Sequence, residues 1–265
     1  MPPSDVHHEH TPVVPIIEPV PHISVRGLTM AYGDNIVMRD LDFEIRRGEI
    51  FVIMGGSGCG KSTLLRHLVG LQQPAAGAVF FNGENFTAAT EARRDVMRHD
   101  FGVMYQSGAL WTSLTLAENV ALPLREHTQL STREIDEIVR YKLALVGLAG
   151  FEEYYPAQIS GGMTKRASLA RSMALDPDVL FLDEPGAGLD PVTSRLLDNL
   201  ILQIRDSLGA TIVVVTHELQ NIFAVADRAL FLDIATRTIG ALGHPVELRD
   251  NSPNPRVRHF LSRSD

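Results

Sequence analysis

A glycine-rich stretch, "GGSGCGKST" from Gly55 to Thr63, has the residue types and spacing of a phosphate-binding loop. It fits the pattern G-x-x-x-x-G-K-[ST], in which backbone N–H groups surround phosphates and the following helix N-terminus adds partial positive charge. Lys61 is expected to reach the β- and γ-phosphates of a nucleotide, and the Ser62 hydroxyl to bind Mg²⁺. The predicted phosphate cradle consists of Gly55, Gly56, Ser57, Gly58, Cys59, Gly60, Lys61, Ser62 and Thr63.

Cys59, inside this loop, has two interpretations. Either only a small residue fits there, or the nearby helix N-terminus lowers the pKa of the thiol and makes it reactive. In the second case, a thiol-blocking reagent would stop nucleotide binding and ATP would protect the cysteine.

Two adjacent carboxylates, Asp183 and Glu184, follow the apolar run "VLFL". Neighbouring side chains at a strand end point in different directions, so we expect the two acids to have different roles. Asp183 would hold Mg²⁺ through water, and Glu184 would orient and deprotonate a water that attacks the γ-phosphate. The pair therefore predicts nucleotide hydrolysis.

Three further side chains are candidates for the same site. His217, after the run "TIVVVT", is expected to touch the γ-phosphate or to hold the attacking water, and Gln106, after "FGVMY", to join the metal and water shell. Tyr32 either stacks on the adenine base or is an ordinary strand aromatic. The residues leave both interpretations of Tyr32 open.

The elements that must position these groups are four short apolar runs, at 50–54, 101–105, 179–182 and 211–216. Helical patterns separate them, which is typical of a parallel sheet covered by helices on both faces. Ligands of such sheets bind beyond the carboxyl ends of the strands. Each run ends in one of the polar groups described above, so we expect a single site.

Other segments flank this sheet. Residues 23–45 alternate in polarity around a turn at 33–35 and predict two antiparallel strands, while residues 107–175 are mainly helical and predict an inserted helical subdomain. The proline-rich residues 1–21 predict a mobile tail. Their histidines, His7, His8 and His10, either bind a metal or are simply solvated. One domain over 22–250 and a C-terminal tail over 251–265 complete the prediction.

Composition excludes several classes of protein. The chain has 265 residues and a formal net charge of −8, which argues against a nucleic-acid partner. One cysteine rules out an internal disulfide and fits a reducing compartment. No apolar stretch approaches the ~20 residues of a membrane helix, and the N-terminus has no apolar signal core. A role at a membrane would therefore require a partner protein.

A second glycine motif, Ser160-Gly161-Gly162, precedes a predicted helix that begins at Met163. Ser160 can cap that helix, and its bare amides can bind an anion. A glycine pair weakens a helix start unless something must approach closely. Since the phosphate loop already holds the nucleotide of its own chain, these residues are expected to meet the nucleotide of a second copy. That predicts a head-to-tail dimer with two ATPs at its interface.

Taken together, residues 23–250 resemble an ATP-binding-cassette (ABC) ATPase subunit. The phosphate loop resembles Walker A, Gln106 the Q-loop, "ISGGM" the signature, "VLFLDEP" Walker B, "GLDP" (188–191) the D-loop and His217 the switch histidine. The resemblance implies an α/β P-loop NTPase. It would have a mainly parallel RecA-like core sheet, an N-terminal antiparallel β subdomain and an inserted α-helical subdomain. It also implies ATP-driven closure of a dimer coupled to a transmembrane permease.

The signature differs from the common Leu-Ser-Gly-Gly-Gln, with Ile159 in place of Leu and Met163 in place of Gln. This stretch and residues 105–128 are similar to ATPases of MCE-type lipid transporters, above all the maintenance of lipid asymmetry system. The resemblance implies phospholipid transport between the envelope membranes. It places the ATPase subunit on the cytoplasmic side of the inner membrane. The implied partners are a permease, a periplasmic MCE-domain protein and a small STAS-domain subunit.

The helical subdomain is expected to offer the permease a groove beside Gln106. Leu110, Trp111 and Leu114 are candidates for this contact, and a core role for them is the alternative. Three other functions stay open: the ATPase of a different importer or exporter, a soluble ABC protein acting on DNA or ribosomes, and a nucleotide switch that barely hydrolyses ATP.

Overall fold

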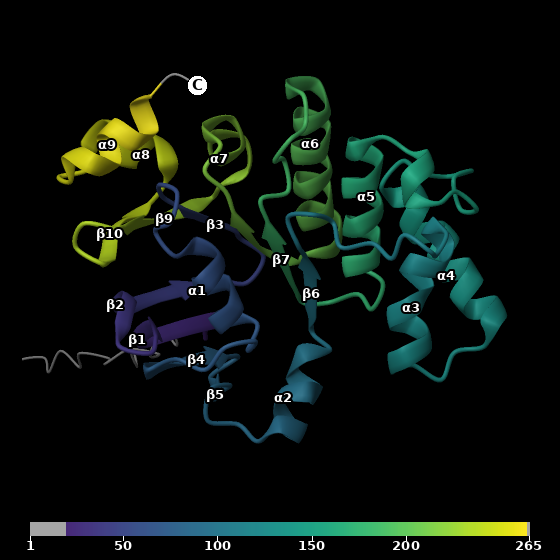
Figure 1. Cartoon of the computed structure of the whole chain (residues 1–265), viewed down its shortest axis with the longest axis horizontal. Helices are drawn as coiled ribbons and strands as arrows, with labels where there is room; N and C mark the ends of the chain where they lie inside the picture. The colour runs from purple at the N-terminus through teal and green to yellow at the C-terminus, as the bar shows by residue number, and fades with distance from the viewer. Residues whose placement is uncertain (1–19, 264–265) are drawn as a thin grey trace, which may run out of the picture.

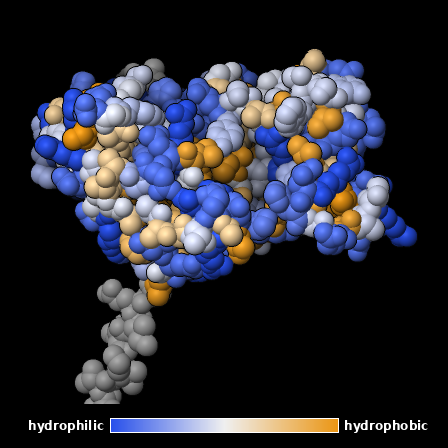
Figure 2. Space-filling model, turned by 60° about the horizontal axis from the view of Figure 1, so that its bottom comes forward, coloured by the Kyte–Doolittle hydropathy of each residue, from blue (hydrophilic) through white to orange (hydrophobic). Residues whose placement is uncertain are grey.

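The structure, a computed structural model, describes residues 20–263. The predicted N-terminal tail, with its three histidines, lies almost wholly outside these residues. Figure 1 shows two sheets on one side of the molecule and a group of helices on the other. No described helix is long and apolar enough to span a bilayer, and the face shown in Figure 2 is mainly hydrophilic, with apolar residues in small separate clusters.

The core sheet contains the four apolar runs found in the sequence. Its strand order is β10-β9-β3-β8-β7-β6, parallel throughout except for the edge strand β10. The strands are β3 (Ile50–Met54), β6 (Phe101–Met104), β7 (Val179–Asp183), β8 (Thr211–Val215), β9 (Arg228–Asp233) and β10 (Thr238–Gly243). The predicted α/β fold with a mainly parallel core sheet is confirmed, whereas β9 and β10 were not identified from the sequence.

Both faces of this sheet are buried, and alternate residues of each strand enter two different cores. Along β8, Ile212 and Val214 join the core that contains the helical subdomain, whereas Val213 and Val215 join the core beneath the second sheet. Fully burying such a side chain contributes roughly 1.5–3 kcal/mol. A strand buried on both sides must be apolar at every position, which explains the uninterrupted runs in the sequence.

The second sheet is antiparallel, with strand order β2-β1-β4-β5. It consists of β1 (Ile23–Tyr32), β2 (Asn35–Ile45), β4 (Ala76–Phe81) and β5 (Glu84–Asn85). The predicted hairpin is present: Tyr32 pairs with Asn35 across a turn at Gly33, whose φ is 57°. Helix α1 (Lys61–Leu68) shares one apolar core with this sheet and with β3. The hairpin therefore holds Tyr32 beside the helix that follows the phosphate loop.

The helices of the predicted insertion lie between β6 and β7 in the chain and form the right-hand side of Figure 1. They are α3 (Leu116–His127), α4 (Thr132–Leu145) and α5 (Gly161–Ser172), with a short 3₁₀ turn at Pro156–Gln158. Capping boxes start α3 and α4, with Thr115 and Ser131 accepting from the backbone. The remaining helices are α2 (Glu91–Arg98), α6 (Pro191–Leu208), α7 (Leu219–Val225), α8 (Pro245–Asn251) and α9 (Pro255–Ser262).

Most of the segment predicted as a C-terminal tail is folded. Residues 255–262 form α9, which buries Val257, Phe260 and Leu261 and places Phe260 edge-on to Phe231 at 5.3 Å. Pro255 occupies the first helical position, where its missing N–H costs nothing, and Asn254 caps the helix.

Candidate nucleotide-binding site

The phosphate loop connects β3 to α1 and depends on glycine for its shape. Gly60 is the N-cap of α1 with φ 96°, and an added Cβ would lie 2.8 Å from Val37 Cγ1. No side chain of the described residues caps α1, so its first-turn amides are available to an anion. Lys61 Nζ donates to the carbonyls of Gly55 at 3.0 Å and Gly56 at 3.2 Å.

These residues open onto a cavity of about 490 Å³ that also receives side chains from the other strand ends. Its lining residues are Tyr32, Val37, Ser57, Gly58, Gly60, Lys61, Ser62, Thr63, Gln106, Glu184 and His217. The carboxyl ends of β3, β6, β7 and β8 therefore meet at one place. Val37, on β2, was missed from the sequence because nothing in an isolated strand shows which residue will face α1.

The interpretation of Cys59 as a reactive thiol is not supported. The side chain is fully buried, and this burial raises the pKa of the thiol despite the nearby charge of Lys61. An added Cβ on Gly55 would lie 2.7 Å from Cys59 Sγ, so the sulfur packs against the loop backbone. The small-residue interpretation explains this position.

Cys59 in the native chain should therefore resist alkylation at neutral pH. We expect N-ethylmaleimide to modify it at least about tenfold more slowly than in the urea-unfolded chain, because little thiolate forms and access is blocked. Mass spectrometry of quenched samples measures the rate. Rapid native labelling that ATP prevents would restore the reactive-thiol interpretation.

The two predicted Mg²⁺ ligands, Ser62 and Asp183, lie beside one another. Ser62 Oγ donates to Asp183 Oδ1 at 3.4 Å. Burial raises the pKa of Asp183, and the negative charge of Glu184 raises it further. A hydroxyl and a carboxylate side by side are oxygen donors of the kind Mg²⁺ prefers, so this pair fits the metal.

Glu184 has the surroundings of a general base. It is 8% exposed, and its Oε1 accepts from His217 Nδ1 at 2.7 Å. Its Oε2 is buried and has no hydrogen-bond partner among the described residues. Its backbone has φ 47°, an uncommon conformation for a residue other than glycine, and such strain persists where the surroundings impose it. The unpaired oxygen can accept a proton from water.

Gln106 and Tyr32 lie at the edges of the site. Gln106 lines the main cavity and also a neighbouring one of about 560 Å³ that contains Asp183. Tyr32 is 49% exposed, and its hydroxyl lies 3.5 Å from Thr63 Oγ1. The ring is accessible at the end of β1 beside the cavity, so adenine stacking stays a prediction for Tyr32, alongside the role of an ordinary strand aromatic.

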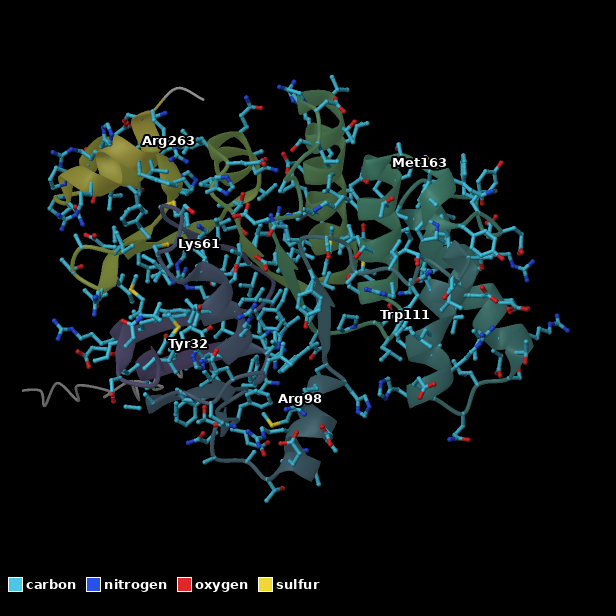
Figure 3. The ribbon with its side chains drawn as sticks, in the orientation of Figure 1. Tyr32, Lys61, Arg98, Trp111, Met163 and Arg263 are labelled. Carbon is cyan, nitrogen blue, oxygen red and sulfur yellow. The ribbon has the colours of Figure 1, made fainter. Side chains whose placement is uncertain are left out.

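Ser160 and Gly161 are remote from the phosphate loop of their own chain. Neither lines the cavity that contains Lys61, and Figure 3 shows Met163, on the same helix, well apart from Lys61. Ser160 caps α5 by accepting from Met163 N at 3.3 Å. Ser160 and Gly161 are exposed, so a second molecule can reach them.

The glycine pair itself serves two different needs. An added Cβ on Gly162 would lie 2.3 Å from Thr193 Cγ2, whereas one on Gly161 would meet nothing within 4 Å. Gly162 is therefore required by packing of α5 against α6 within the chain, and only Gly161 is left for a close approach from outside. Ile159 and Met163 pack against the main core, which gives both departures from the common signature a structural role.

Replacing each glycine separately should distinguish the packing role of Gly162 from the exposed role of Gly161. Gly162→Ala overpacks the α5–α6 contact at a cost of about 1–3 kcal/mol, and thermal unfolding should show a Tm lower by roughly 2–10 °C. Gly161→Ala should leave Tm unchanged or higher, since alanine favours a helix by up to ~1 kcal/mol, yet reduce ATP turnover. Equal effects of the two substitutions on Tm would contradict this division.

The fold and the site together define an ATP-hydrolysing P-loop cassette, and the chain belongs to the ABC transporter family, whose match covers residues 38–187. It is 41% identical over 239 residues to the intermembrane phospholipid transport system ATP-binding protein MlaF of Escherichia coli strain K12, with 90% of this chain and 88% of that protein covered. A probable ribonucleotide transport ATP-binding protein, mkl, of Mycobacterium tuberculosis strain H37Rv is also 41% identical, over 91% of this chain and 66% of that protein.

Among solved structures, the chain resembles the dimeric ATP-binding cassette MJ0796 bound to ADP and Pi, with TM-score 0.76 and 28% identity over 84% of this chain and 98% of that one. The protein is thus an ATPase of the ABC type. Cassettes of this family work as dimers with transmembrane partners.

Proposed function

We propose that this chain is the energy-coupling subunit of an inner-membrane transporter that moves phospholipid between envelope membranes. The observation that carries the ATPase chemistry is Glu184, buried beside the phosphate loop with one oxygen bound to His217 and the other unpaired. The cargo and the location are proposed from the similarity to the phospholipid transport ATPase MlaF over nine-tenths of the chain.

In the proposed reaction, the loop amides and Lys61 hold the phosphates of ATP, and Tyr32 stacks on the adenine. Ser62, Asp183 and Gln106 would hold Mg²⁺, which supplies positive charge to the β- and γ-phosphates when bound. Oε2 of Glu184 accepts a proton from water as the water attacks the γ-phosphate in line. His217 donates from Nδ1 to Glu184, which orients the carboxylate and leaves Nε2 for the γ-phosphate.

A second copy completes each site in this proposal. Ser160 and Gly161 are exposed, start a helix and cannot serve the nucleotide of their own chain, so they are assigned to the γ-phosphate held by the partner copy. The remaining partners are proposed by similarity: a permease, a periplasmic MCE-domain protein and a STAS-domain subunit, with the ATPase on the cytoplasmic side of the inner membrane.

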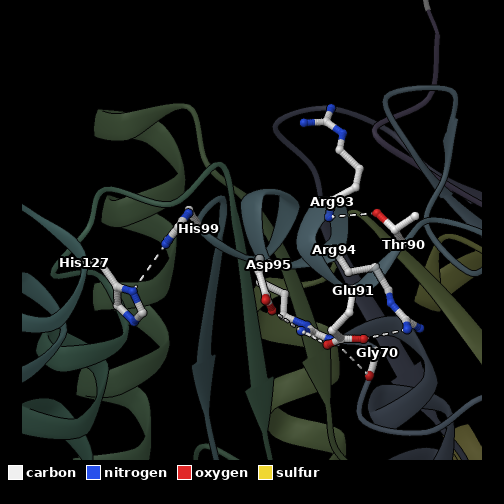
Figure 4. A network of polar contacts seen from close by, with 9 residues as sticks. Gly70, Thr90, Glu91, Arg93, Arg94, Asp95, His99 and His127 are labelled. Carbon is white, nitrogen blue, oxygen red and sulfur yellow. Dashed lines mark hydrogen bonds and ion pairs between the residues drawn. The ribbon is translucent and has the colours of Figure 1, made fainter.

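We place the permease contact at a groove between the core and the helical subdomain, which Gln106 does not line although the sequence predicted the groove beside it. Its volume is about 550 Å³, and α2, β6, α3 and α5 supply its walls. Figure 4 shows His99 and His127 pointing toward each other between α2 and α3, with 3.3 Å between Nε2 and Nδ1. On α2, Glu91 forms ion pairs with Arg94 and Arg98, so the α2 side of the groove carries charged side chains held by ion pairs.

Trp111 does not line this groove, but it is 60% exposed and therefore not a core residue, whereas Leu110 packs against the core. Arg171, which lines the groove, donates to the carbonyl of Ala109 at 2.7 Å and so ties the Trp111 segment to it.

We expect Trp111→Ala to leave Tm and the affinity for ATP unchanged, because the ring buries little surface. ATPase stimulation by the permease should fall several-fold, because an exposed aromatic is a common interface anchor. Turnover of the isolated chain and of the membrane complex provides the comparison. A large loss of Tm would instead show that the ring is needed for folding.

The proposed cargo is tested by purifying the chain with its native membrane partners and identifying the proteins and lipids that accompany it. A permease with an MCE-domain protein and bound phospholipid is the expected result. A complex containing a solute-binding protein would overturn the cargo. The similarity to the ribonucleotide transport protein mkl makes transport of a different solute the second candidate.

A further inference from the structure

A buried lysine on helix α5 contacts the backbone of two segments of the candidate site. Lys165 is 8% exposed, and its Nζ donates to the main-chain carbonyls of Gln106 and of Glu184, the latter at 3.2 Å. Gln106 follows β6 and Glu184 follows β7, and these two strands are parallel neighbours with Met104 opposite Leu182. One amine therefore joins the signature helix to the carboxyl ends of two core strands.

The Glu184 carbonyl depends on this contact in a specific way. It also accepts from Ala187 N at 3.2 Å, so both of its lone pairs are in use. Glu184 has the left-handed backbone already described, which needs support from its surroundings. Lys165 and Ala187 N therefore both hold the Glu184 carbonyl, and with it the backbone from which the Glu184 side chain extends.

Burying a lysine at this position carries a free-energy cost. Burial lowers the pKa of Lys165, while the charges of Glu218, Asp183 and Glu184 act to raise it. Within residues 20–263 the Lys165 ammonium donates to these two carbonyls, which are neutral acceptors, and burying a charged group is costly. Methionine would fill a similar volume without that cost, so simple packing does not account for the residue.

We propose that Lys165 is a positioning residue that fixes the backbone of Gln106 and Glu184 to helix α5. Ser160 lies at the start of the same helix, five residues away, or about 7.5 Å along the axis. Because the helix is rigid over this length, a displacement caused by the partner copy's nucleotide at Ser160 moves Lys165, and with it both carbonyls. Lys165 thereby couples the two nucleotide sites; this coupling rests on the proposed ATP-sandwich dimer, whereas the positioning within one chain does not.

The test is Lys165→Met in the full chain, measured with ATP alone. We expect kcat to fall about 10- to 100-fold, since a misplacement of 1 Å costs on the order of 100-fold, while KM changes less than about threefold because the phosphate loop is untouched. The Hill coefficient for ATP should fall to 1. In the nucleotide-free chain, amide hydrogen exchange should accelerate at 106–109 and 184–188.

Lys142→Met is the matched control. Lys142, on α4, is 1% exposed and pairs with Asp176, which follows α5, and neither residue lines the nucleotide cavity, so the variant also removes a buried lysine. It should leave kcat, the Hill coefficient and exchange in those two segments unchanged. Lys165→Gln, which is neutral and too short to reach both carbonyls, repeats the test if the methionine variant does not fold.

Each outcome decides the proposal. Unchanged kcat and exchange in a folded Lys165 variant would overturn it, as would unfolding of both Lys165 variants beside a folded Lys142→Met, which would show a purely structural lysine. A wild-type Hill coefficient of 1, without ATP-dependent dimers, would refute the ATP-sandwich dimer and the proposed coupling. The kcat and exchange results would still test the positioning role of Lys165 within one chain. None of these measurements depends on the transported cargo.

Discussion

Glu184→Gln should abolish steady-state ATP turnover while leaving ATP binding intact. The amide is nearly the same size and can still meet His217 Nδ1 through its oxygen, but it cannot take a proton from water. General-base catalysis contributes about 10²–10⁴-fold, so we expect kcat to fall by at least about 100-fold. Phosphate release and fluorescent-nucleotide titration provide kcat and affinity.

The same substitution should change the oligomeric state. ATP that is bound and not hydrolysed keeps the two copies together, so size-exclusion chromatography with light scattering should show ATP-dependent dimers of Glu184→Gln. Asp198→Asn is the control, because Asp198 is also a buried acid but lies on α6 and bonds to Asn221 at 2.7 Å. Undiminished turnover in Glu184→Gln would remove this residue from its assigned role and favour a nucleotide switch with a different chemistry.

The second large effect comes from mixing two inactive variants. Lys61→Met should lose turnover because the phosphates lose their cation. Gly161→Asp should lose it because a carboxylate would face the partner copy's γ-phosphate, although the side chain has open space within its own chain. In a mixed dimer, one site combines both defects and the other is intact.

Random mixing makes half of the dimers mixed, so up to about a quarter of wild-type turnover should return. Each variant assayed alone at the same total concentration is the control. If Gly161 served the nucleotide of its own chain, every site in the mixture would carry one defect. No activity would then return, and the assignment of the signature to a second copy would fail.

Much of the site could be predicted because its signals are local. The glycines of the phosphate loop, the lysine and the helix that follows form one continuous segment whose geometry depends on neighbouring residues. The carboxylates and His217 each follow an apolar run, and parallel strands bring their carboxyl ends together. For these residues, position along the chain was enough to indicate position in space.

Other assignments failed or stayed open for an equally physical reason. The thiol of Cys59 was judged from the nearby helix end, but burial against Gly55 has the larger effect on its pKa. Residues 251–265 were assigned as a tail, but residues 255–262 form α9, which contacts β9 more than 20 residues earlier in the chain. Lys165 lies in a stretch that reads as an ordinary basic helix face.

The sequence by itself determined the cassette: the phosphate loop, the two acids, the alternation of strands and helices, and the signature. These follow from backbone conformation and from the period of apolar residues, which act over a few residues. Only the tertiary structure decided that Gly162 serves the contact with Thr193 and Gly161 the outside, that Met163 packs into the core, and that Lys165 holds the backbone of Gln106 and Glu184. Those roles depend on which distant surfaces meet, and that is settled when the whole chain packs.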